Sequence, residues 1–406
     1  MLRRLAALTL TGLVVSLALA SPSVAGRPDR EPIRFASYNA SLNRSTEGGL
    51  IADLSNPNNA QAAAVAEVIQ RVRPDVLLIN EFDYDAEGVA LGLFQTNYLS
   101  VAHNGSQPIH YAYRYSAESN TGIPSGFDLD NNGSVGGGND AFGFGAFPGQ
   151  FGMAVYSMYP IEFDEIRTFQ HFLWKDMPGA LLPDDLATPA PNDWYSAEEL
   201  EHVRLSSKSH WDIPIDLGRR TVHFLVSHPT PPVFDGPEDR NGTRNFDEIR
   251  FWADYISGGS RARYIYDDQG RRGGLVGDGR RFVIAGDQNS DPLDGDSIPG
   301  AIQQLLEHRE IDATFTPESG GAVEQNALQM GANLTHRSDP RFDTADFADV
   351  PGPGNLRADY VLPSRKLEVV GGAVFWPRTD EPFYELIGVF PFPTSDHKPV
   401  YIDIAA

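Results

Sequence analysis

The sequence predicts an α/β fold, and three observations support this class. Residues 33–38 alternate apolar and polar side chains, as a strand with one buried face does. Residues 59–73 follow with apolar side chains on one helical face, and Pro74 ends that helix. Residues 76–79 are continuously apolar, as in a strand that is buried on both faces. The chain therefore opens with a strand, a helix and a second strand.

Further strand-like runs return along the chain and are separated by long segments rich in Gly, Pro and charged residues. Helical periodicity is predicted over 245–257 and over about 299–308, whereas 316–356 has the composition of a loop. The sequence has no internal repeat and no clear linker, so we expect a single domain over residues 26–406 with long loop insertions. The strand-like runs are 151–157, 203–209, 221–227, 282–286, 359–362, 373–376 and 400–404.

Residues 1–25 have the pattern of a secretory signal peptide. Arg3 and Arg4 precede an apolar run over 5–20, and Ser23-Val24-Ala25 is a small-x-small cleavage site. The alternative is a membrane anchor, but the run is short for a span and no basic cluster follows it. We therefore expect a secreted protein with no stable membrane span, and nothing in the sequence indicates an obligate protein partner.

The composition limits both the stability and the partners of this chain. It contains no cysteine, so no disulfide stabilises it, and core burial must do so. The net charge is −23. Such a surface repels long polyanions unless a basic groove or bound cations intervene.

Several polar residues stand where predicted strands end, which is where an α/β sheet forms its site. Carboxylate and amide oxygens among them suit Mg²⁺, Mn²⁺ or Ca²⁺, whereas zinc as the sole metal is disfavoured without cysteines or a spaced histidine pair. Two histidines can bind phosphate or transfer protons, so the set favours attack on phosphorus. Each residue taken singly is better explained as a turn former, a helix cap or a structural histidine. The residues are Asn39, Glu81, His228, Asp287, Asn289, Asp359, Asp396 and His397.

The order and local context of these residues are more specific than their types, because seven short motifs run from residue 34 to residue 400. They are Arg34-Phe35-Ala36-Ser37-Tyr38-Asn39, Leu77-Leu78-Ile79-Asn80-Glu81, Gly152-Met153-Ala154-Val155-Tyr156-Ser157, Ser227-His228-Pro229, Gly286-Asp287-Gln288-Asn289, Arg357-Ala358-Asp359-Tyr360-Val361 and Ser395-Asp396-His397-Lys398-Pro399-Val400. In this order they resemble the endonuclease/exonuclease/phosphatase superfamily. The resemblance implies a four-layer α/β sandwich, in which two mixed β-sheets pack face to face with helices outside.

The resemblance further implies a divalent-metal-dependent phosphoesterase that attacks phosphate esters in line with an activated water. Glu81 would bind the metal ion, helped by Asn39 and Asp396. The ion would be Mg²⁺ or Mn²⁺, with Ca²⁺ as an alternative.

The remaining matched residues would act on the phosphate and the water. Asp287, oriented by Asn289, would position or deprotonate the attacking water. His228 and His397 would stabilise the phosphate as charge builds. Asp359 would hold His397 in one tautomer.

Two sets of residues are candidates for substrate binding. A phosphate-contacting tyrosine of the family usually lies between the metal-binding Glu and the first His, and Tyr113 competes for that place with Tyr111 and Tyr115, while Asn120 is a substitute. Lys208 and His210 lie in a polar run that we expect to pair, as a hairpin, with the strand before the first catalytic histidine. Lys208 and His210 alternate with Ser207 and Ser209, so either the Lys/His pair or the serine pair would face the substrate. An exposed polar strand face explains the run slightly better.

A separate segment has the spacing of a calcium loop. Asp128, Asp130 and Asn132 occupy alternate positions, and Gly133 stands at the sixth place, where the loop must turn sharply. The twelfth place is Asn139 rather than the usual bidentate glutamate. A structural Ca²⁺ and a plain Asp/Asn/Gly turn therefore explain this segment equally well.

Three functions fit these observations. The first is a phosphomonoesterase or phosphodiesterase that acts on an extracellular small-molecule or lipid-linked phosphate. The alternative is an extracellular DNA or RNA endonuclease with the same site. A non-catalytic binding relative is a remote third, because every motif residue is present. The acidity of the chain favours the first.

Overall fold

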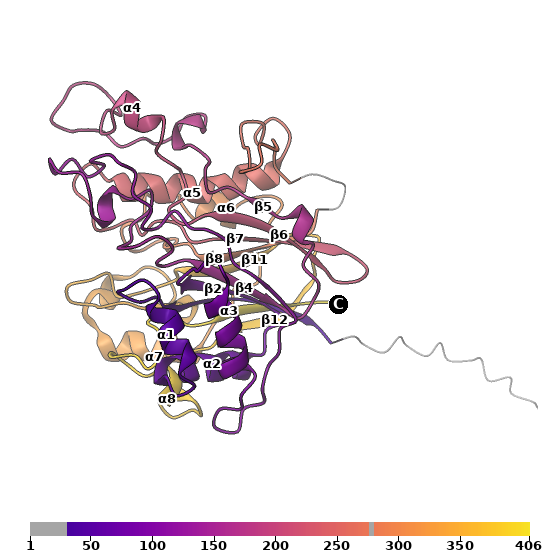
Figure 1. Cartoon of the computed structure of the whole chain (residues 1–406). Helices are drawn as coiled ribbons and strands as arrows, with labels where there is room; N and C mark the ends of the chain where they lie inside the picture. Colours follow the sequence, from indigo (N-terminus) through magenta and orange to yellow (C-terminus); the bar gives the residue numbers. More distant parts are fainter. Residues whose placement is uncertain (1–30, 276–279) are drawn as a thin grey trace, which may run out of the picture. The chain divides into compact units, whose positions relative to one another are not determined.

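Two β-sheets lie face to face at the centre of the computed structural model, which describes residues 31–275 and 280–406 (Figure 1). The first sheet has six strands in the order β12-β13-β1-β2-β4-β3. Strands β1 and β2 are parallel, and the other neighbours are antiparallel. The strands span Ile33–Leu42 (β1), Val76–Phe82 (β2), Tyr113–Tyr115 (β3), Met153–Ser157 (β4), Val369–Val374 (β12) and Val400–Ile404 (β13).

The second sheet has five strands in the order β11-β8-β7-β6-β5. Strands β7 and β8 are parallel, and the rest are antiparallel, so both sheets are mixed. A separate pair is formed by β9 (Ala345–Asp346) and β10 (Asn355–Leu356). The sheet strands span Arg167–Thr168 (β5), His210–Asp216 (β6), Thr221–Ser227 (β7), Phe282–Asp287 (β8) and Asp359–Pro363 (β11).

The alternation of side chains along each strand explains how the sheets pack. In β7, Phe224 belongs to the core between the sheets, whereas its neighbour Leu225 belongs to the core under the outer helix. The ring of Phe224 meets that of Phe35 in β1 edge to face, with the ring centroids 5.5 Å apart. Burial of each such side chain contributes about 1.5–3 kcal/mol, so the packing between the sheets stabilises the fold.

Helices cover the outer face of each sheet (Figure 1). Helix α2 (Ala60–Val72) packs on the first sheet, and its N-cap Asn59 accepts a hydrogen bond from a backbone N–H of the first turn. Helix α5 (Arg240–Ser257) packs on the second sheet through Ile249 and Trp252. The predicted four-layer α/β sandwich is thus confirmed. The other α-helices are Gly49–Ser55 (α1), Val89–Phe94 (α3), Ala197–Leu200 (α4), Gln303–Leu306 (α6), Gly320–Gln329 (α7) and Tyr384–Ile387 (α8). The short 3-10 and π turns are Gln95–Leu99, Gly138–Asp140, Phe163–Glu165, Trp174–Asp176, Gly331–Thr335 and Pro340–Phe342.

Three predicted elements are wrong. The expected strand over 203–209 is irregular, and β6 begins only after it, at His210, although the expected hairpin with β7 is present. The expected helix over 299–308 is reduced to the single turn of α6. The expected loop over 316–356 contains α7, whose opening glycines are poor helix formers but let it approach Trp376 closely.

The predicted signal peptide, residues 1–25, lies outside the described residues. Pro32–Ala406 forms one compact unit. Across 31–275 and 280–406, no helix is both long and apolar enough to span a bilayer.

Candidate active site

The two sheets bring their polar strand ends together at one edge. In the first sheet, Asn39 and Glu81 lie toward the carboxyl ends of the parallel strands β1 and β2. In the second, Asp287 ends β8 and pairs in register with Asp359, the first residue of β11. His228 directly follows β7, the parallel neighbour of β8. Residues from five strands therefore converge on one buried site.

Asp287 lies at the centre of this site. Its Oδ2 accepts a hydrogen bond from Asn39 Nδ2 at 3.1 Å, and it lies 3.3 Å from His228 Nε2 and 3.6 Å from His397 Nε2. Burial raises the pKa of Asp287, but the positive charge of His397 and hydrogen bonds from His228 and Asn39 outweigh burial and hold that pKa well below its usual range. The carboxylate is therefore ionised at neutral pH.

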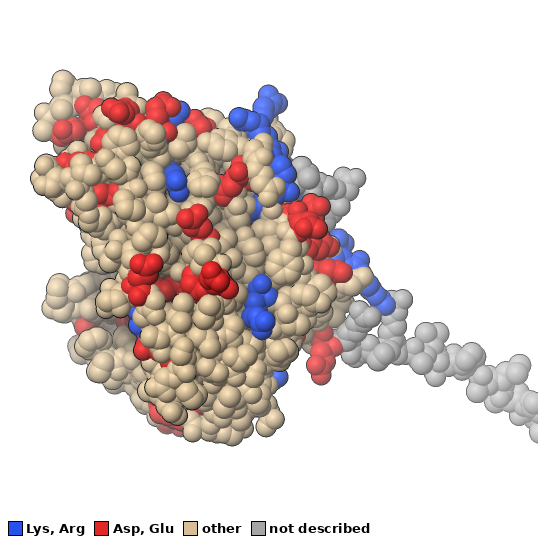
Figure 2. All heavy atoms as spheres, in the orientation of Figure 1, with Lys and Arg blue, Asp and Glu red and all other residues tan. Residues whose placement is uncertain are grey.

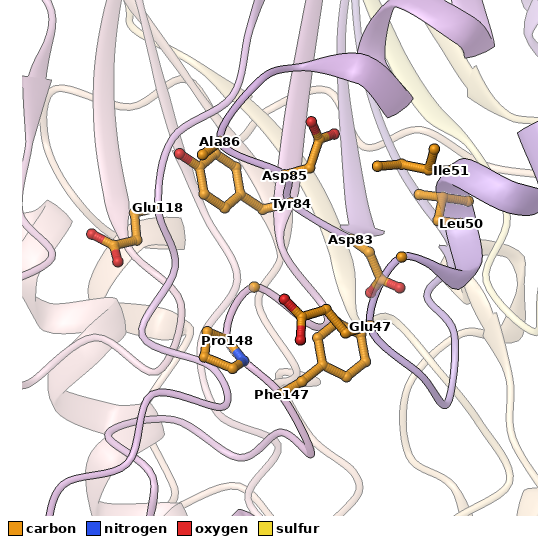
Figure 3. Close-up of a pocket in the computed structure, with 12 residues that line it drawn as sticks. Glu47, Leu50, Ile51, Asp83, Tyr84, Asp85, Ala86, Glu118, Phe147 and Pro148 are labelled. Carbon is orange, nitrogen blue, oxygen red and sulfur yellow. The ribbon is translucent and has the colours of Figure 1, made fainter.

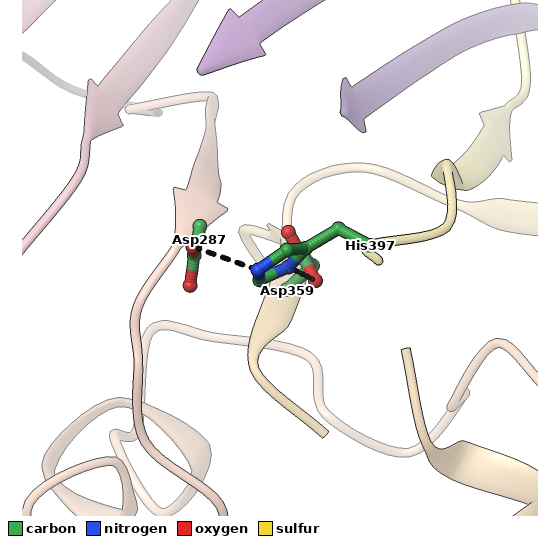
Figure 4. A group of neighbouring side chains, drawn as sticks. All are labelled: Asp287, Asp359 and His397. Carbon is green, nitrogen blue, oxygen red and sulfur yellow. Dashed lines mark hydrogen bonds and ion pairs between the residues drawn. The ribbon is translucent and has the colours of Figure 1, made fainter. Parts of the chain in front are cut away.

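His397 and Asp359 form a buried pair beside Asp287 (Figure 4). His397 Nδ1 lies 2.8 Å from Asp359 Oδ2, and the same oxygen accepts a hydrogen bond from Thr344 Oγ1 at 2.8 Å. Burial lowers the pKa of His397, but Asp359 and Asp287 outweigh burial and raise it well above its usual value. The ring is thus a cation whose Nε2 faces Asp287.

His228 is in the opposite charge state. Burial and the nearby charge of Lys208 lower the pKa of His228 to about 4, so the ring is neutral at pH 7. Its Nδ1 is buried, and no described residue forms a hydrogen bond with it. The neutral ring therefore presents Nε2–H toward Asp287, and the two histidines of the site differ in charge.

Glu81 faces the same site from the first sheet. It adopts a left-handed backbone conformation, with φ 58°, and its Oε2 accepts a hydrogen bond from Asn43 Nδ2 at 2.8 Å. Burial raises the pKa of Glu81, and Asp396 adds to that rise, although His397 opposes it. A divalent cation between oxygens of this kind would relieve both burial and repulsion, so the donor set fits Mg²⁺ or Mn²⁺. Asn39 donates its amide N–H to Asp287, and its Oδ1 accepts from the backbone of Ser41.

The site contains a second group of side chains that could in principle hold a metal ion. Asp287, Asp359 and His397 each have a ligand atom within 4.8 Å of the ligand atoms of the other two. We interpret this group as a hydrogen-bonded relay rather than a metal centre. The imidazole Nδ1 is already bonded to Asp359, and a protonated ring has no lone pair for a cation.

Two backbone features fix the position of Asp287. Gly286 lies so close to β7 that an added Cβ would stand 2.0 Å from the carbonyl oxygen of Ser227, so only glycine fits there. Asn289 is left-handed, with φ 50°, and its backbone N–H donates to Asp287 Oδ1 at 2.9 Å. Its side chain donates to the carbonyl of Pro229 at 3.1 Å. These contacts tie the segment after β8 to the segment that follows β7.

The expectation for Tyr113 is wrong. It pairs with Ser157, which also pairs with Val76 at the start of β2, so it lies at the end of the sheet opposite Glu81. Tyr111 and Tyr115 are also remote, because the first donates to the carbonyl of a proline and the second packs its ring against Trp211. Sequence order alone does not reveal which end of an antiparallel strand a residue occupies.

The polar run before β6 divides into residues that face the site and residues that do not. His210 points into the outer layer, with Nδ1 2.5 Å from Ser206 Oγ and Nε2 2.9 Å from the carbonyl oxygen of Glu248, so its expected substrate role is wrong. The side chain of Asn120 is fully used by Arg204 and two backbone carbonyls. Lys208, by contrast, interacts electrostatically with the catalytic carboxylates.

Sequence reasoning missed four residues that support the site. Asn43 and Asn80 bond to Glu81 and to the backbone N–H of Asp287, respectively. Thr344 bonds to the carboxylate that orients the catalytic imidazole. Glu248 in α5 is buried and accepts the backbone N–H groups of Ser207 and Thr230. For Glu248, the only signal in the sequence was an acidic residue on an amphipathic helix.

The calcium-loop segment lies between β3 and β4 in the chain and contains none of these residues. Asp128, Asp130 and Asp140 bring one oxygen each within 4.8 Å of the others, so Asp140 takes the place expected for Asn139. Asn132 is exposed, and its backbone N–H donates to Asp128 and Asp130. Calcium binding there stays a prediction.

This fold and site define a class of protein, a metal-assisted hydrolase of phosphate esters. The Endonuclease/Exonuclease/phosphatase family model matches residues 36–397, and the chain belongs to that family. It is accordingly a divalent-metal-dependent phosphoesterase.

Solved structures with a similar fold share little sequence with this chain. An endonuclease/exonuclease/phosphatase from Beutenbergia cavernae DSM 12333 is 17% identical, with 93% of this chain and 72% of that chain covered and a TM-score of 0.48. Sphingomyelinase C from Streptomyces griseocarneus is 14% identical, with 92% and 99% covered and a TM-score of 0.43. Truncated TDP2 from Caenorhabditis elegans is 13% identical, with 92% and 98% covered and a TM-score of 0.43. No curated protein matches the chain.

Proposed function

We propose that this protein is a secreted enzyme that hydrolyses an extracellular phosphomonoester or phosphodiester, on a small or lipid-linked molecule, by in-line attack of water. The observation that carries this proposal is the arrangement around Asp287 Oδ2, with Asn39, His228 and His397 at 3.1–3.6 Å. An ionised carboxylate flanked by one cationic and one neutral imidazole suits a reaction that moves charge onto phosphate oxygens.

The residues divide the work as follows. A carboxylate with so low a pKa is a weak base, so Asp287 orients the attacking water through a hydrogen bond. His397, protonated and held by Asp359, binds a phosphate oxygen as negative charge increases. His228 donates a neutral N–H. Glu81, with Asp396, would hold Mg²⁺ or Mn²⁺, which acts as a Lewis acid on the phosphate when bound.

A cleft formed by the segment that follows β2 supports the choice of substrate class (Figure 3). It encloses about 310 Å³ and includes Asp83, two residues beyond Glu81, together with the rings of Tyr84 and Phe147. Negative charges along this wall repel further phosphates, so a long polynucleotide gains little there. The carboxylates that line the cleft are Glu47, Asp83, Asp85 and Glu118.

The surface charge agrees with this choice on the face in view. Figure 2 shows acidic side chains in several groups over that face, while basic side chains gather mainly toward its right-hand edge. Among the residues drawn in colour there, the basic side chains form no continuous stripe along which a nucleic-acid backbone would lie.

The test is a parallel assay of the purified mature protein with Mg²⁺, Mn²⁺ and Ca²⁺. The substrates are plasmid DNA, RNA, a phosphomonoester and a phospholipid. We expect metal-dependent turnover of the phosphomonoester or the phospholipid. Faster turnover of plasmid DNA or RNA would support the endonuclease alternative instead, and no turnover of any substrate would refute the proposal.

A further inference from the structure

Lys208 is a buried lysine beside the catalytic carboxylates, and the roles described so far do not use it. Only 7% of its surface is exposed. Its ammonium interacts electrostatically with Glu81, Asp287 and Glu248, and its positive charge also acts on His228. A buried lysine is rarely kept in a fold without a partner for its charge, because desolvation of an ammonium is costly.

The ammonium of Lys208 has no direct partner among residues 31–275 and 280–406, because no hydrogen bond or ion pair reaches its Nζ there. Lys398, the other buried lysine, differs in this respect. Its Nζ donates to the carbonyl of Ser395 at 3.0 Å and lies 4.4 Å from the ring centroid of Phe392. Lys398 is thus satisfied by the fold, whereas Lys208 keeps three unused donors near the catalytic carboxylates.

The backbone around Lys208 is held on three sides. The N–H of Ser207 donates to Glu248 Oε1 at 2.6 Å, and the hydroxyl of Ser207 donates to the carbonyl of His228 at 3.2 Å. The carbonyl of Lys208 accepts a hydrogen bond from the N–H of Asn120 at 2.8 Å. This irregular segment before β6 is therefore fixed against the catalytic histidine, and the lysine is positioned before any substrate arrives.

We propose that the ammonium of Lys208 contacts a non-bridging oxygen of the substrate phosphate and stabilises its charge in the transition state. The inference rests on the proposed function. Burial lowers the pKa of Lys208, whereas Glu248, Glu81 and Asp287 oppose that shift and favour the ammonium. Because His228 is neutral, Lys208 supplies a side-chain cation to the site in addition to His397. An ammonium is a compact point charge with three donors, which suits a phosphate oxygen whose exact direction changes during the reaction.

Because Lys208 lies near Glu81, the inference predicts opposite effects on two measurable affinities, those for metal and for phosphate. A cation beside the metal-binding carboxylate repels a divalent metal ion, whereas it attracts phosphate. Removal of the charge should therefore strengthen metal binding and weaken phosphate binding. A lysine that merely stabilised the fold would not change the two affinities in opposite directions.

The experiment compares Lys208→Met, Lys208→Arg and wild type, with the exposed Lys366→Met as the matched control. We measure kcat and KM on the substrate found above, the Ki of inorganic phosphate, and Mn²⁺ affinity by calorimetry. For Lys208→Met we expect kcat/KM to fall about 100-fold. We also expect Ki to rise about tenfold and Mn²⁺ to bind a few-fold more tightly. Lys208→Arg should keep much of the phosphate affinity, and Lys366→Met should match wild type.

Two outcomes overturn the inference. One is an unchanged phosphate Ki in Lys208→Met, and the other is a fall in Mn²⁺ affinity together with phosphate affinity. If Lys208→Met does not fold, Lys208→Gln undergoes the same two binding measurements, and an unchanged Ki there is decisive against the inference. If wild type hydrolyses no phosphoester, the proposed function fails. Phosphate affinity is then measured by calorimetry in place of Ki, and the two binding measurements still decide whether Lys208 binds phosphate.

Discussion

The pair of His397 and Asp359 allows a quantitative prediction. The two residues are buried, 2.8 Å apart, and the carboxylate keeps the imidazole protonated. A hydrogen bond to a charged group contributes about 1.5–3 kcal/mol. If this stabilisation is needed in the transition state, Asp359→Asn should lower kcat by a factor of about 10 to about 150, with little change in KM.

The assay is steady-state kinetics combined with NMR titration of the His397 ring. His397→Ala should lower kcat by about 100-fold or more, and Asp359→Asn should lower the pKa of His397. Because the two side chains act as one unit, the double variant should be much less impaired than the product of the single losses. Multiplicative losses would show that they work separately, and the role assigned to Asp359 would then be wrong.

A matched control exists in the second sheet. His223 Nδ1 lies 2.7 Å from Asp212 Oδ1, so the chain contains a second histidine–carboxylate pair outside the site. Asp212→Asn breaks the same kind of interaction and should lower the melting temperature while kcat stays near wild type. A loss of kcat comparable to that of Asp359→Asn would mean that general destabilisation explains both variants.

Three further predictions test other parts of the molecule. Chelation should abolish turnover, and Glu81→Gln should weaken metal affinity about tenfold or more in calorimetry; full activity in excess chelator contradicts the metal assignment. If Asp130 and its neighbours bind Ca²⁺, calcium should raise the melting temperature, and Asp130→Ala should remove that gain but not the catalytic metal site; an unchanged calcium response in the variant refutes the site. Burial raises the pKa of Asp343 to about 9, so its folded form keeps a proton that the unfolded chain loses above about pH 4. Stability should therefore fall as pH rises from 5 to 8, relative to Asp343→Asn, by up to about 1.4 kcal/mol per pH unit in urea unfolding; a difference that does not vary with pH would show that the carboxyl is not held neutral.

Local sequence was sufficient to predict the parts of the site that follow buried strands. Glu81 stands two residues after a continuously apolar run, and Asp287 is the last residue of an apolar strand, so the position of the strand end fixes the position of the side chain. The long helix α5 was also predictable, because its apolar side chains recur on one face. In these cases the residues adjacent in the sequence are enough to predict the structure.

The sequence could not show features that depend on strand register or on contacts between distant segments. Tyr113 does lie in a strand, but the antiparallel pairing of β3 with β4 places it at the end of the sheet that is away from the site. His210 and Lys208 stand two residues apart, yet the first packs under α5 and the second interacts with the catalytic carboxylates. The alternation expected of a strand fails here because the backbone before β6 bonds to side chains of α5 and to a loop rather than to a sheet.

The left-handed backbones of Glu81 and Asn289 have a consequence for attempts to make this enzyme more robust. Such a conformation costs a residue with a side chain about 1–2 kcal/mol, and glycine avoids that cost. Selection for heat tolerance alone would thus favour glycine at Glu81, where burial of the carboxyl adds to the cost, although the greater freedom of glycine in the unfolded chain reduces the gain. At Asn289 the lost hydrogen bond to Pro229 offsets the gain. The most thermostable members of a random library would then be enriched in inactive molecules. Directed evolution of this scaffold should therefore score turnover and thermal survival in the same round.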